Sequence, residues 1–498
     1  MHSPPPDESR DRTPALWLLS CLALTLFAAT ALGGFRADDW INLERGRWAW
    51  TAAGAHGIWT SVNPFSLYRP LVDLWHGLML RLFGLNTPPM LLVLSVLLLA
   101  QSLLLGRLVR AHGGSRAAAR LASVAVWCQP NAYAWTALWV SNATGSLMAT
   151  FALLALLLFA RAARIGARGG NMLPSLVLMT LAFLAGALCK EEIVLLPAAV
   201  FALECLHWPQ RAPNERRSRL TAWVTLVVVT AAYTLFRTHI VPTPQFGESR
   251  YHLRLGMHVF SNIFFFLQHL VAMPLVTLIL ARFWVPAAFA AQARTGAAWS
   301  RARTFILSGL GWSVAASLLY LPISGRPGYG YLYIPAFGVA YALAHALDFA
   351  SQAASAAGSR RSVVAPLAVH AALASVLCGA GLAGIAWHRY PQLVASAEAR
   401  LLSEHPSPPR GARMVFLDSG EPTRETFAGR TIFNLVFDDA SGSFLRLVYD
   451  RDDLDAVIIH GPIQEQFETP PGTIAIYRAE RGELTPWAGA APPGGQPK

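Results

Sequence analysis

The chain has little charge for a protein of its length. Only 14% of its 498 residues are charged, whereas 54% are hydrophobic. Soluble globular domains carry about 25% charged residues, so this composition excludes an ordinary soluble enzyme. Several apolar runs reach the roughly 20 residues that a membrane-spanning helix needs. The sequence therefore predicts a polytopic α-helical protein whose first partner is the lipid bilayer.

Cysteine is also scarce, and no two cysteines have the spacing of a metal site. The five are Cys21, Cys128, Cys189, Cys205 and Cys378, each in or at the end of an apolar run. Structural zinc sites and disulfide frameworks need closely spaced or patterned cysteines. We therefore expect small core residues here, and neither a disulfide framework nor a cysteine metal centre.

Lysine is almost absent. Of 40 basic residues, only Lys190 and Lys498 are lysine, and the remaining 38 are arginine. The arginines form short clusters between apolar runs, which argues against nucleic acid as a partner and follows the positive-inside rule. Basic loops follow every second span, so an eleven-span protein in a bacterial inner membrane is expected, with the N-terminus cytoplasmic and the C-terminus extracytoplasmic. The expected spans are 15–32, 88–106, 118–139, 143–160, 172–189, 192–208, 220–240, 270–291, 304–322, 331–350 and 364–388.

The apolar runs divide the chain into four regions. We expect a cytoplasmic tail at 1–13, a membrane domain at 14–389, a small extracytoplasmic α/β domain at 390–485 and a loose tail at 486–498. The fold class is thus a helical membrane bundle with a small α/β domain at its C-terminal side. Strands are predicted at 414–417, 456–459 and 473–477, with a helix at 423–436.

The first outer loop, 35–86, contains one clear pattern. Leu71, Leu74, Trp75 and Leu78 recur at helical spacing, which predicts an amphipathic helix lying in the membrane interface. Asp73, His76 and Arg81 lie off this apolar stripe and are expected on its polar side.

Polar residues that carry chemistry fall on the outer side by the same parity. Asp38 and Asp39 follow the first span directly, and Arg69, Lys190 and Arg326 lie in other outer loops. Each has a plainer interpretation as a polar turn at a helix end. Their shared side favours a joint site, whose pocket would add Tyr68, Trp139, Asn142, Glu191 and Tyr331.

These residue types suit the transfer of a group from a lipid-linked phosphate to a hydroxyl. A carboxylate supplies the base for the hydroxyl, and arginine and lysine bind phosphate oxygens. Aromatic side chains can stack on a sugar. Because phosphate leaves without a separate general acid, a single carboxylate suffices for an in-line, inverting displacement.

Five short segments occur in an order that resembles the class C glycosyltransferases, which use polyprenyl- or dolichyl-phosphate sugars. They are Asp38-Asp39-Trp40, Tyr68-Arg69-Pro70-Leu71 with Phe83-Gly84-Leu85-Asn86, Trp139-Val140-Ser141-Asn142, Leu188-Cys189-Lys190-Glu191 and Gly330-Tyr331-Leu332-Tyr333-Ile334-Pro335. The chain looks like the bacterial relatives of membrane O-mannosyltransferases that carry tetratricopeptide repeats. The likeness covers about 35–345, and no 34-residue repeat follows residue 390.

The resemblance implies roles for particular residues. The acidic pair would supply the catalytic carboxylate, as Asp38 or Asp39, and Arg69, Lys190 and Arg326 would hold the donor phosphate. No cofactor is expected. A divalent metal on the two aspartates stays an alternative, although the sequence shows no further cluster of ligands.

The expected function is therefore a membrane glycosyltransferase that moves a sugar from a polyprenyl-phosphate donor to a glycan, lipid or protein hydroxyl. One alternative is a transporter or flippase of lipid-linked sugars. Such proteins often place ionisable groups at mid-membrane, whereas Glu204, Arg282 and Asp348 lie toward the cytoplasmic ends of their spans. A non-catalytic scaffold of envelope assembly is the third interpretation, and it predicts that the outer charges are scattered.

Overall fold

The computed structural model describes residues 19–25, 27–28, 35, 37–61, 68–128, 138–240, 256–271, 275, 279, 296–318, 320–322, 329–356, 390–418, 441–460, 470–480 and 483–487. Arg326 and the expected helix at 423–436 lie outside these residues. So do the expected span at 364–388, half of that at 15–32 and most of that at 270–291.

Four helices in the described part of the chain are long and apolar enough to cross a membrane. They belong to α5 (Thr87–Ala111), α8 (Ala143–Ala167, preceded by the short 3-10 helix η3, Val140–Asn142), α11 (Pro213–Ile240) and α16 (Tyr333–Ala356). A helix of 24 residues is about 36 Å long, against a hydrocarbon core of about 30 Å. The prediction of an integral membrane protein is confirmed.

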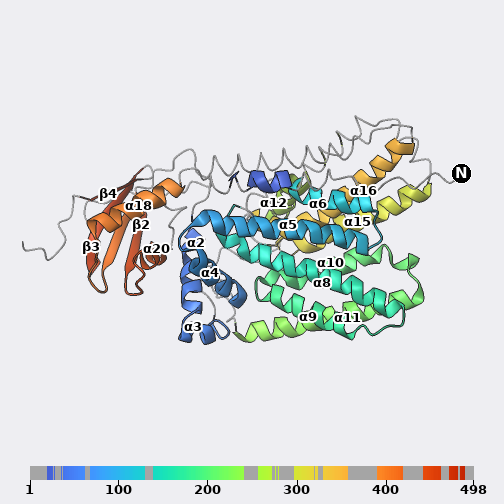
Figure 1. The fold of residues 1–498 in the computed structure, drawn as a ribbon, viewed down its shortest axis with the longest axis horizontal. Helices are drawn as coiled ribbons and strands as arrows, with labels where there is room; N and C mark the ends of the chain where they lie inside the picture. The colour runs from blue at the N-terminus through green and yellow to red at the C-terminus, as the bar shows by residue number, and fades with distance from the viewer. Residues whose placement is uncertain are drawn as a thin grey trace, which may run out of the picture.

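Shorter helices lie beside these four (Figure 1). They are α6 (Arg116–Ala125, continued by η2, Val126–Cys128), α9 (Leu173–Ala187), α10 (Leu196–Cys205, preceded by η4, Glu191–Leu195), η5 (Trp208–Gln210), α12 (His258–Phe266, continued by η6, Leu267–Val271) and α15 (Gly296–Ser317). The span expected at 192–208 begins late, because Pro197 occupies the first turn of α10 and disfavours helix before it.

The first outer loop is more helical than its sequence pattern indicates. It contains α2 (Ala37–Ala49), α3 (Ala52–Gly57) and α4 (Pro70–Phe83), of which α4 is the predicted amphipathic helix. The acidic pair thus lies in the first turn of α2, where carboxylates interact favourably with the helix dipole. Helices α2 and α4 cross at Gly46 and Gly77, where a methyl group on either glycine would collide with the backbone of the other helix. This close crossing fixes one face of α2 against α4.

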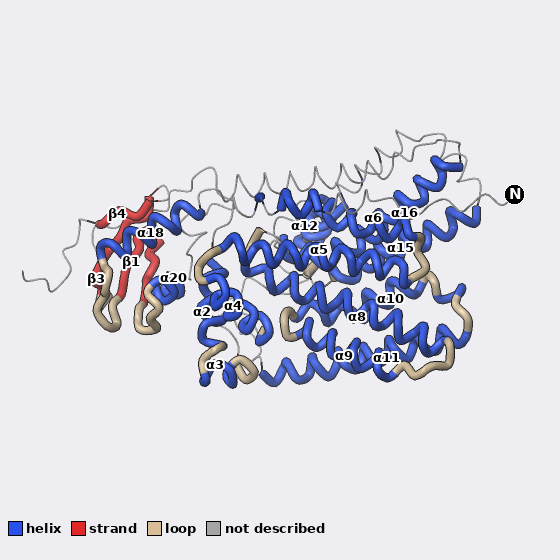
Figure 2. The backbone as a smooth tube through the Cα atoms, viewed as in Figure 1, coloured by secondary structure: helices blue, strands red, loops and turns tan. Residues whose placement is uncertain are grey.

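The C-terminal region contains a four-stranded sheet (Figure 2). Its strands are β1 (Arg413–Asp418), β2 (Asp455–His460), β3 (Thr473–Glu480) and β4 (Glu483–Pro486), in the order β2-β1-β3-β4. The central strand β1 is parallel to β2 and β3, and β4 is antiparallel to β3. Helix α18 (Tyr390–Glu404) precedes the sheet, and α20 (Ser441–Val448) lies between β1 and β2 in sequence. The three predicted strands are confirmed.

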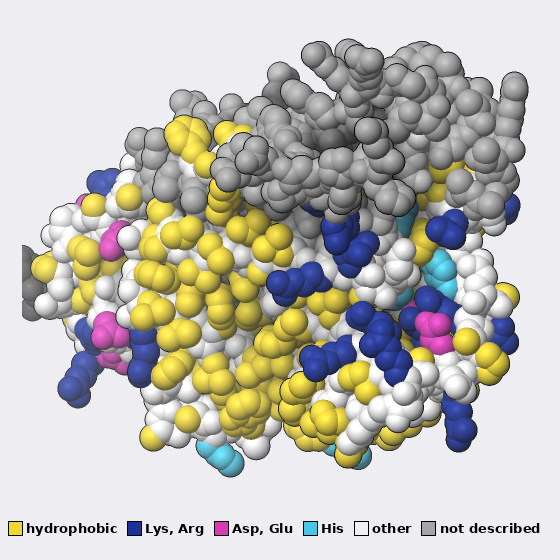
Figure 3. Space-filling model, turned by 45° about the vertical axis from the view of Figure 1, so that its right-hand side comes forward, with side chains coloured by type: hydrophobic (Ala, Val, Ile, Leu, Met, Phe, Trp, Pro, Cys, Tyr) yellow, Lys and Arg dark blue, Asp and Glu magenta, His cyan; other side chains and the backbone are white. Residues whose placement is uncertain are grey.

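The bundle has two different ends. Helices α2, α3 and α4 lie at the end next to the sheet, called here the domain end (Figure 1). The opposite end, called the arginine end, has the connections from α5 to α6, α8 to α9 and α10 to α11. Figure 3 shows a broad hydrophobic surface on the side of the bundle and basic side chains gathered toward one end. Such a distribution suits a protein whose middle lies in lipid.

Candidate functional site

Asp39 connects α2 to the start of α8. Its side chain is fully buried, and its Oδ1 accepts hydrogen bonds from the Ser141 backbone amide at 2.6 Å and from the Ser141 hydroxyl. Asn42, on the same face of α2, donates to the Ser141 hydroxyl oxygen at 3.0 Å. Asp38 is only partly buried. The two predicted acids therefore differ: Asp39 anchors the helix, and Asp38 is the more open carboxylate.

Arg69 and Glu191 form a two-pronged ion pair between residues 122 positions apart. The Arg69 Nε and Nη2 atoms lie 3.2 and 2.9 Å from the two Glu191 carboxylate oxygens. Burial alone would raise the pKa of Glu191, but the Arg69 guanidinium, with a smaller contribution from Arg237, holds it at about 2. The Leu71 amide also donates to the Leu188 carbonyl at 3.3 Å. The start of α4 is thus fixed to the turn after α9.

Lys190 pairs with Glu192 in the same turn, and both side chains are about 6–7% exposed. The Lys190 ammonium also lies 5.2 Å from the centre of the Tyr331 ring, within range of a cation–π interaction. Tyr331 comes from η7 (Tyr329–Leu332), which precedes α16. The predicted phosphate ligands Arg69 and Lys190 are therefore each beside a carboxylate, which the sequence interpretation did not anticipate.

Arg237, in the last turn of α11, is a further cation of this region. Its charge acts on Glu191 and lowers that pKa. Among the residues that the structure describes, no carboxylate pairs with Arg237, and its Nε is buried without a hydrogen-bond partner. We define Arg69, Lys190, Glu191, Glu192 and Arg237 as the domain-end cluster. Its three cations outnumber its two carboxylates, so the cluster has room for an anion.

The expected pocket residues have different surroundings. Tyr68 is buried, and its hydroxyl donates to the Trp59 carbonyl at 3.2 Å. Trp139 precedes η3, directly before the segment that binds Asp39. Asn142 is buried at the N-cap position of α8, although its side chain makes no capping hydrogen bond.

Two polar residues of α4 are buried inside the molecule, whereas the helical pattern predicted them on the polar, solvent-facing side of the helix. Asp73 and His76 are 4% and 0% exposed because α2 packs over this face of α4. Asp73 accepts a hydrogen bond from the Arg45 Nε at 3.1 Å. Burial nevertheless raises the pKa of Asp73 to about 6, and burial lowers the pKa of His76 to about 4. In the sequence, the only signal that these two residues share a buried face is their three-residue spacing on one helix.

A cavity of about 560 Å³ lies at the arginine end and does not touch the residues above. Among the described residues that line it, none is a carboxylate that could act as a base for a hydroxyl. Its lining residues are Leu103, Gly106, Arg107, Arg110, Ala111, Ala119, Arg120, Ser123, Leu157 and Arg164. We therefore place the candidate site at the domain end. In the described part of the chain, no group of three histidine, cysteine or acidic side chains is arranged to hold a metal ion.

Comparison with known proteins gives a fold. No protein-family model matches the chain, and neither does any curated protein sequence. The crystal structure of ArnT from Cupriavidus metallidurans in the apo state matches with a TM-score of 0.52 and 15% identity. The match covers 89% of this chain and 85% of ArnT. The same protein bound to undecaprenyl phosphate matches with a TM-score of 0.51, 17% identity and the same coverage.

The chain has a class C glycosyltransferase fold. This confirms the fold that the resemblance of five short segments implied. The narrower likeness to O-mannosyltransferases is not confirmed. The orientation of the termini and the domain limits remain predictions.

Proposed function

We propose that this protein is an integral-membrane glycosyltransferase. It transfers a sugar from a polyprenyl-phosphate donor to a hydroxyl on a glycan, lipid or protein outside the cytoplasm, with inversion. The observation that carries the proposal is the domain-end cluster, which has an excess of one cation and lies at the same end of the bundle as the acidic pair.

Each component of the reaction has a candidate residue. Arg69, Lys190 and Arg237 bind the donor phosphate, while Glu191 and Glu192 keep two of these cations in place before the donor arrives. Arg326 remains a proposed fourth phosphate ligand. The binding of undecaprenyl phosphate by ArnT, a protein of the same fold, supports a lipid-phosphate donor.

Asp38 is the better candidate for the base. A base must reach the acceptor hydroxyl, and the Oδ1 of Asp39 is already bound to two donors of Ser141 inside the protein. Asp39 then acts as the group that orients the first turn of α2. The aromatic residues Tyr68, Trp139 and Tyr331 are proposed to shape the sugar site, together with Asn142.

The test compares Asp38→Asn and Asp39→Asn with the wild type in full-length protein reconstituted into vesicles. The readout is release of undecaprenyl phosphate from a panel of undecaprenyl-phosphate sugars, with a bacterial membrane extract as acceptor. We expect Asp38→Asn to lower turnover about 10²- to 10⁴-fold, which is the usual contribution of a general base. Asp453→Asn, an exposed carboxylate of the C-terminal region, is the matched control. Normal turnover in both site variants would exclude this mechanism, and translocation without transfer would favour a flippase.

A further inference from the structure

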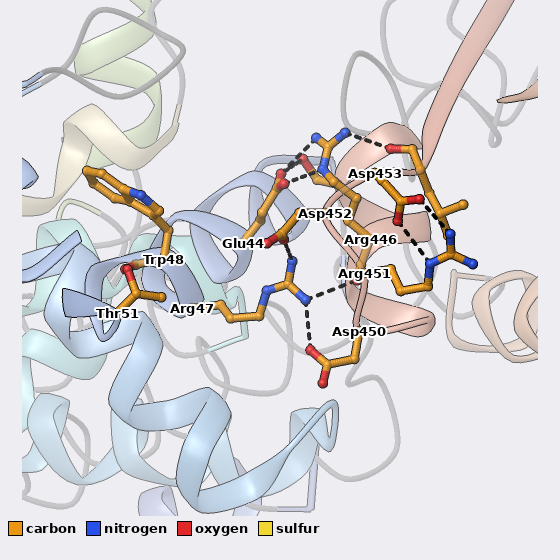
Figure 4. Close-up of polar contacts among 11 residues, drawn as sticks. Glu44, Arg47, Trp48, Thr51, Arg446, Asp450, Arg451, Asp452 and Asp453 are labelled. Carbon is orange, nitrogen blue, oxygen red and sulfur yellow. Dashed lines mark hydrogen bonds and ion pairs between the residues drawn. The ribbon is translucent and has the colours of Figure 1, made fainter. Parts of the chain in front are cut away.

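Helix α2 has two faces that contact different parts of the protein. Asp39, Asn42 and Gly46 recur at intervals of three and four residues and face η3 and α4. Trp40, Glu44 and Arg47 recur in the same way on another face of the helix. Figure 4 shows Glu44 and Arg47 of this face directed at the C-terminal region. Since α2 has only 13 residues, such a helix depends on tertiary contacts for its stability and its orientation.

Glu44 is held by two residues of α20. The guanidinium of Arg446 binds both carboxylate oxygens, with Nη2 at 3.0 Å from Oε2, and the Ser443 hydroxyl donates to the same Oε2 (Figure 4). The remaining Arg446 nitrogen donates to the Leu454 carbonyl at 3.1 Å, just before β2. These bonds with Glu44 raise the pKa of Arg446. A two-pronged arginine–carboxylate pair fixes direction as well as distance, so α20 orients this face of α2.

An aromatic contact lies one helical turn nearer the acids. Trp40 is 1% exposed, and its ring centre is 4.9 Å from that of Phe444 at an interplanar angle of 67°. The ring centre of Phe35 also lies 4.9 Å from that of Trp40. Trp40 directly follows Asp39 in the sequence. A movement of α20 would therefore be transmitted to the turn that carries both acids.

Arg47 makes the outermost contacts: its Nη1 donates to the Arg446 carbonyl at 3.2 Å, and its guanidinium pairs with two exposed carboxylates. It lies 2.8 Å from Asp450 and also pairs with Asp452, whose side chains are 89% and 90% exposed. Exposed pairs of this kind contribute little to stability. The Arg47 contact therefore provides a matched control for the two inner contacts.

We propose that the C-terminal α/β region positions the acidic pair, through the Glu44–Arg446 ion pair and the Trp40–Phe444 contact. The region is then a part of the transferase site, and Glu44 and Arg446 are positioning residues that do not touch the donor. This inference rests on the proposed function above. It adds that the domain-end cluster binds the donor without the C-terminal region, whereas the acids need it to act.

The test uses the full-length variants Glu44→Arg and Arg446→Glu and the double variant that carries both exchanges. We expect each single variant to lower kcat at least tenfold while the KM for undecaprenyl-phosphate sugar changes less than twofold. Amide hydrogen exchange in residues 38–47 should become faster. The double variant should recover a large part of kcat and of the exchange protection, because opposite charges again face each other between α2 and α20. Arg47→Gln should change each quantity less than twofold.

Exchange in β1 reports whether the sheet remains folded in each variant. Unchanged kcat in both single variants overturns the inference, whether or not α2 exchanges faster. A rise in donor KM equal to the loss of kcat also overturns it, because the pair would then serve donor binding. If the wild type turns over no donor, the proposed function fails, and unchanged exchange in 38–47 would show separately that α20 does not hold α2.

Discussion

At the arginine end, one carboxylate is surrounded by cations, whereas at the domain end each of two cations has a carboxylate of its own. Glu204 binds Arg219, lies 3.2 Å from His112 and has Arg211 at 3.7 Å. Glu215 pairs with both arginines at 2.8 and 3.0 Å. These five residues, the arginine-end cluster, join α5, α10 and α11. Their two arginines equal their two carboxylates in number.

Part of the domain-end cluster is as buried as the arginine-end cluster, but the two clusters differ in their balance of cations and carboxylates. Lys190 and Glu192 are as well hidden as Glu204, so burial alone does not distinguish a site from a structural network. The difference is Arg237, whose charge no described carboxylate pairs with directly. An ionic network with balanced charges suits helix packing, whereas one with an excess cation is suited to bind an anionic ligand.

The largest effect is expected from breaking the arginine-end cluster. Arg219→Met leaves Glu204 buried with less compensation, and such a change typically costs about 3–5 kcal/mol. We expect a clear fall in Tm and unchanged turnover per folded molecule, measured by thermal unfolding and donor release. Arg217→Met, an exposed arginine of the same helix, should leave Tm unchanged. A normal Tm for Arg219→Met would contradict the structural role of this cluster.

Lys190→Met, which removes a cation of the domain-end cluster, should lower donor turnover. Loss of one phosphate ligand is expected to lower donor turnover about 10²-fold, as for other groups that stabilise developing charge. The variant also leaves Glu192 uncompensated, so the double change with Glu192→Gln separates the two effects. The double variant should regain Tm and remain slow. Recovery of turnover in the double variant would show that Lys190 is structural.

Arg237→Gln removes the excess cation of the domain-end cluster. A hydrogen bond to a charged group contributes about 1.5 kcal/mol or more, so the KM for the donor should rise about tenfold with little change in Tm. Steady-state donor release at several concentrations measures this. Arg168→Gln at the arginine end is the control. An unchanged KM would remove Arg237 from the phosphate site.

Asp73 should contribute the smallest change, visible as a dependence on pH. Because burial raises its pKa from 3.8 to about 6, the folded chain keeps this proton where the unfolded chain has lost it. Stability from this group is full below about pH 4 and declines as the pH rises through 6. The Tm difference between wild type and Asp73→Asn should therefore shift by a few degrees between pH 4.5 and 7.5. A constant difference would contradict the raised pKa.

Several features could be predicted because local composition decides them. The apolar runs determine long helices, the spacing of Leu71, Leu74 and Leu78 predicts α4, and short apolar runs predict the three strands of the sheet. The common side of Asp38, Arg69 and Lys190 followed from counting spans. Charge pattern and hydropathy are properties of short stretches of sequence, so they can be recognised without knowing which distant segments are in contact.

The tertiary structure alone decided how these residues act. Packing of α2 on α4 buries Asp73 and His76, which a solitary amphipathic helix would leave in water. Partners far apart in sequence, such as Arg69 with Glu191 and Glu44 with Arg446, depend on how the helices and the sheet assemble. From the sequence alone, acids and cations are expected on one side of a membrane bundle. Which acid is anchored, and which cation pairs with no carboxylate in the described part of the chain, depends on three-dimensional packing, because only packing determines which charges are brought together away from water.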